Sequence, residues 1–71
     1  MKTLSDVAAS YEEQAKANEI LAEEILARAH FFPAEVRENQ RWRAGWLMAE
    51  AARLRARAAE LRRIESCQSM N

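Results

Sequence analysis

The chain has 71 residues, of which 49% are hydrophobic and 31% charged, and its eleven basic side chains balance its eleven acidic ones. A chain this short forms one small domain, whose core gives little stability unless a metal, disulfides or oligomerisation adds to it. Cys67 is the only cysteine and His30 the only histidine, which excludes a disulfide framework or a structural zinc site within one chain. We therefore expect no metal and no cofactor, and we expect oligomerisation to supply further burial.

The sequence shows no targeting segment. Polar residues follow Met1 and Lys2 at once, and charge interrupts every apolar run, so neither a signal peptide nor a membrane span is expected. A single thiol fits a reducing compartment. We expect a soluble, cytoplasmic protein without a membrane partner.

The first predicted element is a helix over residues 4–29, because Ala, Glu and Leu dominate and no strand-like alternation occurs. Thr3 or Ser5 can cap its start, and Asp6 places negative charge in its first turn. One side of this helix carries an apolar stripe at helical spacing, made of Leu4, Val7, Ala8, Tyr11, Ala15, Leu21, Ala22, Ile25, Ala29 and Phe32. Within this stripe, alanine recurs every seven residues.

A short connection over residues 30–32 follows. Pro33 restricts Phe32 to extended geometry and suits the first position of a new helix, with Glu35 close behind to favour the helix dipole. A connection this short joins antiparallel neighbours. The sequence therefore predicts a helical hairpin.

The second predicted helix covers residues 33–65, and residues 66–71 form a frayed tail. Leucine and alanine each recur here every seven residues, at Leu47, Leu54 and Leu61 and at Ala44, Ala51 and Ala58. Folding the chain back at the connection brings these columns opposite the stripe of the first helix. We therefore predict a hairpin seam that contains Leu4, Tyr11, Leu21, Ile25, Leu47, Leu54 and Leu61, with small residues that let the two axes approach closely.

The predicted fold class is all-α, a single antiparallel hairpin of two long helices. Two helices alone bury only the surface along which they meet. Two hairpins together form a dimeric four-helix bundle, in which each helix has two neighbours and more of its apolar surface is buried. Residues 1–30 carry three basic and six acidic side chains, and residues 31–71 carry eight basic and five acidic ones. We interpret this difference as attraction between the two helices; the alternative is an arginine surface for phosphate.

Two tryptophans lie away from the Ala and Leu columns of the second helix. Trp46 lies about 100° and Trp42 about 140° round the helix from Leu47. We name the surface around them the tryptophan strip and define it as Arg41, Trp42, Arg43, Trp46 and Arg53. Tryptophan and arginine together are typical of a binding hot spot. The alternative is that both rings fill the dimer core or cover the Phe31–Phe32 turn.

No group of side chains suggests catalysis. Adjacent glutamates such as Glu12 and Glu13 diverge on a helix, and no histidine or cysteine is spaced to join them. We therefore expect a non-enzymatic protein–protein interaction module without a small-molecule substrate. In this interpretation the chain is a homodimer that presents the tryptophan strip to another protein and regulates or inhibits it.

Two other functions remain open. In size and helical-hairpin pattern the chain resembles the plasmid copy-control Rop family of dimeric RNA binders, which implies a nucleic-acid-binding hairpin but carries no residue across. A structural or assembly subunit, with its tryptophans buried between copies, is the other alternative. Short helical chains rich in Ala and Arg are also frequent among phage and mobile-element accessory proteins.

Overall fold

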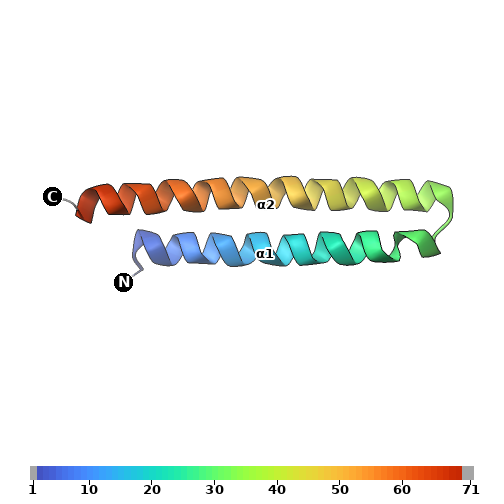
Figure 1. Cartoon of the computed structure of the whole chain (residues 1–71), viewed down its shortest axis with the longest axis horizontal. Coiled ribbons are helices and arrows are strands. Elements are labelled where there is room, and N and C mark those ends of the chain that lie inside the picture. Colours follow the sequence, from blue (N-terminus) through green and yellow to red (C-terminus); the bar gives the residue numbers. More distant parts are fainter. Residues whose placement is uncertain (1, 70–71) are drawn as a thin grey trace.

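The computed structural model describes residues 2–69, which form helix α1 (Leu4–Arg28), a single 3-10 turn η1 (Ala29–Phe31) and helix α2 (Ala34–Ser69). Figure 1 shows α1 and α2 side by side and antiparallel, joined at one end through η1. The molecule is a rod of 58 × 16 × 14 Å. The prediction of an all-α antiparallel hairpin is confirmed, and neither helix has the length and apolar character needed to cross a membrane.

Both ends of the connection differ slightly from the sequence prediction. Helix α1 ends at Arg28 because the next three residues tighten into η1, and Phe32 is extended, with φ −104° and ψ 155°. Helix α2 begins at Ala34, and the carbonyl of Pro33 accepts a hydrogen bond of 2.8 Å from the backbone N–H of Arg37. Pro33 therefore stands just before the helix that it was predicted to begin.

Helix α2 continues to Ser69, beyond the predicted end at residue 65. The carboxylate of Glu65 accepts a hydrogen bond from the backbone N–H of Ser5, which ties this end of α2 to the start of α1. The sequence-based prediction of fraying after residue 65 considered only local propensity and missed this contact. Residues 70 and 71 of the predicted tail lie outside the described part of the chain.

A capping box fixes the start of α1. The hydroxyl of Thr3 accepts a hydrogen bond from the backbone N–H of Asp6, and the Asp6 carboxylate accepts one from the backbone N–H of Thr3, both at 3.1 Å. Two of the N–H groups that a helix start leaves unpaired are thereby satisfied. Thr3 is the N-cap residue, and Ser5 lies inside the helix.

The two helices meet along a column of alanines, which we name the alanine seam. Ala8 and Ala58 lie in one buried cluster with Leu61. Because the helices are antiparallel, seven-residue steps in opposite directions place the next alanines of α1 level with the next alanines of α2. The buried residues of the described chain are the seam members Ala8, Ala15, Ala22, Ala29, Ala44, Ala51 and Ala58, together with Leu61.

The larger residues of the predicted seam stand beside the alanines. Only Leu61 is buried, at 7% exposure, and Leu21 is 44% exposed. The other five are half-buried, namely Leu4, Tyr11, Ile25, Leu47 and Leu54. A residue three positions after a seam alanine lies about 60° to one side of it, so its side chain lines the edge of the contact rather than its centre.

Enlarging a seam alanine should therefore force the helices apart. We expect Ala15→Leu, at a position with no exposed surface, to lower the free energy of unfolding by about 1–3 kcal/mol, because a close-packed layer cannot hold the extra carbons without strain. Urea unfolding followed by far-UV circular dichroism measures this change.

The control is Ala17→Leu, which makes the same substitution at an exposed position of α1. We expect it to change the free energy of unfolding by less than about 0.5 kcal/mol. Both variants should be compared at one protomer concentration, because oligomerisation changes apparent stability. Equal effects of the two substitutions would contradict close packing at the seam.

Gly45 allows the opposite kind of change. It lies inside α2 without a positive φ, and a Cβ added there would meet nothing within 4 Å. We expect Gly45→Ala to raise the free energy of unfolding by about 0.5–1 kcal/mol, because alanine loses less backbone freedom on entering a helix. Thermal and urea unfolding should both show the gain, and a loss of stability would contradict the open surroundings of Gly45.

Candidate functional site

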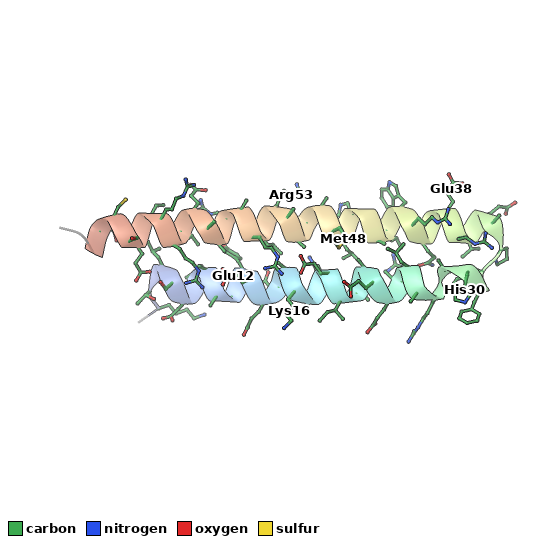
Figure 2. All side chains as sticks on the ribbon, viewed as in Figure 1. Glu12, Lys16, His30, Glu38, Met48 and Arg53 are labelled. Atoms are coloured by element: carbon green, nitrogen blue, oxygen red, sulfur yellow. The ribbon has the colours of Figure 1, made fainter. Side chains whose placement is uncertain are left out.

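One side of the alanine seam is held by ion pairs, and we name it the charged flank. Arg62 donates to both carboxylate oxygens of Glu12, at 2.7 and 3.2 Å, and Arg55 donates to both oxygens of Glu19, at 2.6 and 3.0 Å. Each of these four residues lies four positions after a seam alanine. The +4 positions of the two helices therefore share one side of the hairpin, where Figure 2 shows Glu12 and Met48 at the line between the helices.

These ion pairs perturb the titration of their members. The hydrogen bond from Arg62 lowers the pKa of the Glu12 carboxyl, against an opposing effect of desolvation, and Arg55 does the same for Glu19. In return, the hydrogen bonds to the carboxylates raise the pKa of both guanidinium groups. The four side chains are thus held ionised, and they join the acidic first helix to the basic second one as the charge distribution predicts.

The opposite side of the seam is apolar, and we name it the apolar flank. On a helix, the positions three and four residues after a seam alanine lie to opposite sides of that alanine. Because the +4 positions face the charged flank, the +3 positions face this side. Leu4, Val7 and Tyr11 pack against the Ala8–Ala58–Leu61 cluster. The apolar flank consists of Leu4, Val7, Tyr11, Leu21, Ile25, Leu47, Leu54, Leu61 and Ile64.

A hollow lies at the connection end of the apolar flank. It has a volume of about 190 Å³, and its apolar lining comes from Leu21, Ile25 and Phe32. Glu24, Arg28 and Gln40 complete its wall. The apolar flank therefore extends from the first turn of α1 to the connection without being filled by the chain itself.

The tryptophan strip lies on the outer side of α2. The structure leaves Trp42 70% exposed and Trp46 53% exposed. A hollow of about 250 Å³ is lined by Leu21, Trp42, Arg43, Trp46 and Leu47, so the strip reaches the edge of the apolar flank. Within the hairpin neither ring is buried. At the connection, the rings of His30 and Phe31 are exposed and lie with their centroids 4.0 Å apart.

The arginines of the strip differ in their partners. Arg53 points away from α1 in Figure 2 and forms an ion pair of 2.6 Å with Glu50 on its own helix. Arg41 and Arg43 are exposed and have no ion-pair partner within residues 2–69. The guanidinium groups of the strip that lack an ion-pair partner are therefore the two next to Trp42 in the sequence.

Three neighbouring arginines of α2 are engaged in ion pairs. Arg55 is paired with Glu19 at 2.6 Å and Arg57 with Glu60 at 3.3 Å, in addition to the Arg53–Glu50 pair. A phosphate group would have to displace a carboxylate at each of these side chains.

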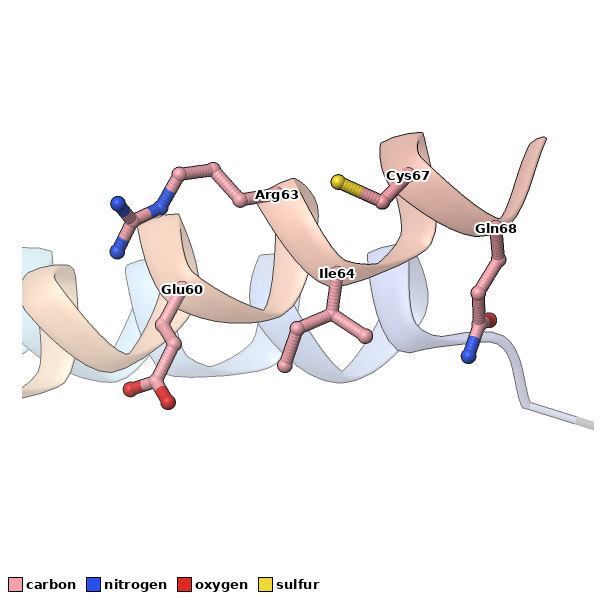
Figure 3. A pocket seen from close by; sticks show the side chains of 5 residues that line it. All are labelled: Glu60, Arg63, Ile64, Cys67 and Gln68. Atoms are coloured by element: carbon pink, nitrogen blue, oxygen red, sulfur yellow. The ribbon is translucent and has the colours of Figure 1, made fainter. Parts of the chain in front are cut away.

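Sequence reasoning missed a third hollow, which lies near the end of α2. It has a volume of about 480 Å³ and is lined by Glu60, Arg63, Ile64, Cys67 and Gln68. Figure 3 shows Glu60, Ile64 and Gln68 on successive turns of one side of the helix, and Arg63 and the Cys67 thiol on the other side in this view. The available signal was the spacing of Ile64, three residues after Leu61. Within residues 2–69, no three His, Cys, Asp or Glu side chains gather to hold a metal ion.

No protein-family model, curated protein or solved structure matches the chain.

The charged flank predicts a dependence of stability on pH. Because the pKa values of Glu12 and Glu19 are lowered in the folded chain, their contribution is present above the unfolded value of about 4.5 and is lost as pH falls through the folded values. We expect Glu12→Gln/Glu19→Gln to lower stability near pH 7 and to make no difference once the pH is low enough to protonate both carboxyls in the folded chain. Urea unfolding across this range measures the difference.

The control for this double variant is Glu13→Gln/Glu23→Gln, which neutralises two exposed glutamates that have no ion-pair partner in the described chain. We expect it to leave the pH profile close to that of the unmodified protein. High salt should also reduce the effect of the Glu12 and Glu19 substitutions, because exposed ion pairs are screened. A difference that persists at low pH would contradict the assigned cause.

Proposed function

We propose that the chain is a small non-enzymatic protein–protein interaction module, a homodimer that regulates or inhibits a partner protein bound at the tryptophan strip. The exposure of Trp42 and Trp46 is the observation that carries this proposal, since 70% and 53% of their surfaces face solvent. Tryptophan supplies a large rigid contact area and is enriched among the residues that dominate binding energy.

The surroundings of the two rings indicate the chemistry of the partner. Arg41 and Arg43 flank Trp42 and have no ion-pair partner within the described residues. A partner with carboxylates around a projecting apolar side chain fits this surface, because the apolar group can pack against the exposed rings of Trp42 and Trp46 and the carboxylates can pair with the guanidinium groups.

The charged residues support a structural rather than a catalytic use of the ionisable groups. Arg62 and Arg55 hold the Glu12 and Glu19 carboxyls ionised by lowering their pKa. A general acid at neutral pH requires the opposite shift. The most strongly paired carboxylates of the hairpin therefore join its two helices.

Substitution of both tryptophans tests the proposal. We expect Trp42→Ala/Trp46→Ala to retain the helical content and molar mass of the unmodified protein, because the strip lies outside the alanine seam, and to lose the partner captured from an extract of the native host. Affinity capture with mass spectrometry measures the partner, and circular dichroism with light scattering measures the fold and the mass.

Met48→Ala is the matched control, because Met48 is also exposed on α2, at 45%, but lies on the charged flank. We expect it to keep the captured partner. Capture that survives in the tryptophan variant would contradict the proposal. Loss of the dimer in that variant would instead assign the rings to self-association and favour the structural-subunit alternative.

A further inference from the structure

The apolar flank is a long surface of the hairpin that the chain itself leaves uncovered. Among its members only Leu61 is buried, whereas Leu21 is 44% exposed and Ile64 is 40% exposed. It runs along both helices, from Leu4 at the start of α1 to Ile25 near the end of that helix, and from Leu47 to Ile64 on α2. A surface of this extent on a small chain indicates an interface.

The central rows of this flank carry no charge within the described residues. Each row contains residues at seven-residue spacing that lie about 60° round the helix from the alanine seam. None of them is charged, and apart from the Tyr11 hydroxyl their polar groups are neutral amides. The rows are Leu4, Tyr11, Asn18 and Ile25 on α1, and Gln40, Leu47, Leu54, Leu61 and Gln68 on α2. A molecule that covers them must present an equally uncharged strip of the same length.

The surface area of the chain indicates how much is left to cover. The hairpin exposes 5523 Å². A compact monomer of its mass, 8.2 kDa, exposes about 4,500 Å². The excess of about 1,000 Å² is close to the area of about 800 Å² that each partner buries in an interface of standard size. One further hairpin packed along the rod would cover a surface of this size.

We propose that a second copy of this chain covers the apolar flank, so that two hairpins form a four-helix bundle with the tryptophan strips left on its outside. This inference rests on the homodimer of the proposed function and assigns the face through which it forms. It separates self-association, at the apolar flank, from capture of another protein, at the strip.

A second copy fits this surface better than an unrelated partner does. The central rows of its own apolar flank have the same length and the same lack of charge, so uncharged rows meet uncharged rows. The chain has no net charge, with eleven basic and eleven acidic residues, so two copies do not repel each other on approach. The unpaired guanidinium groups of Arg41 and Arg43 lie at the tryptophan strip and not in these rows.

Asn18 gives the pairing of copies a fixed register. It is half-buried in the middle of the α1 row, between Tyr11 and Ile25. Its amide must keep a hydrogen-bond partner when the flank is covered, and the amides of a second copy can provide one. A single polar residue in an apolar interface favours the register that satisfies it, at some cost in affinity.

Two neighbouring residues of α1 provide a matched test. Ile20 and Leu21 are exposed to almost the same degree, 47% and 44%, but adjacent helical positions face directions about 100° apart and only Leu21 belongs to the apolar flank. We expect Leu21→Glu to raise the dimer dissociation constant about 100-fold or more, because it leaves an unpaired charge in the interface. Ile20→Glu should change it less than about threefold. Sedimentation equilibrium over a protomer concentration series measures both.

A second variant tests the same face without adding charge. We expect Asn18→Leu to lower the dissociation constant about tenfold, because it replaces a buried amide with an apolar side chain. Trp42→Ala/Trp46→Ala should leave the dissociation constant within about threefold of the unmodified value. The inference would be overturned if the unmodified protein stayed monomeric at every concentration. It would also be overturned if Trp42→Ala/Trp46→Ala abolished the dimer while Leu21→Glu kept it.

The fluorescence of the two tryptophans gives an independent reading, since the chain contains no others. In a dimer formed through the apolar flank, acrylamide should quench Trp42 in Trp46→Phe as strongly at high as at low protomer concentration. Protection of Trp42 on dimerisation would overturn the inference. A dimer with these properties that captures no partner would leave this inference standing and remove the proposed partner binding. A monomer that captures a partner at the tryptophan strip would overturn this inference and keep the proposed partner binding.

Discussion

The alanine seam is the constraint on which the rest of the structure depends. Methyl side chains at every seventh position let the helices approach closely, and they leave no room for a larger residue at the centre of the contact. Seven of the eight buried residues of the described chain are alanines. Because each alanine buries little area, the hairpin gains little hydrophobic stabilisation from its own interior, and its larger side chains remain available for other contacts.

The seam divides the molecule into two unlike sides. Residues four positions after an alanine include Glu12, Glu19, Arg55 and Arg62, whose ion pairs cross between the helices. Residues three positions after an alanine are mostly leucine, isoleucine or tyrosine. Ion pairs join the two helices on one side, where each of these guanidinium groups reaches a carboxylate of the other helix, whereas the other side has apolar groups on both helices and solvent beyond them.

The tryptophan strip is a third surface with a different character. Its rings project from the outer side of α2, where Arg41 and Arg43 add charge that nothing in the described chain neutralises. A surface that combines aromatic area with unpaired guanidinium groups suits a partner of complementary charge, whereas the uncharged apolar flank suits a copy of itself. The proposed function and the proposed self-association therefore use different parts of one helix.

Composition and local signals were enough to predict both helices, the position of the connection at Pro33 and the antiparallel arrangement, because these depend on helix propensity, capping and connection length. The sequence also showed the alanine and leucine columns of α2, but both columns recur every seven residues and lie about 60° apart, so periodicity could not decide which one lies at the centre of the contact. That choice depends on the rotation of each helix about its own axis. Close packing of the alanines decides it, and the same rotation places the leucines at the edge and both tryptophans in solvent.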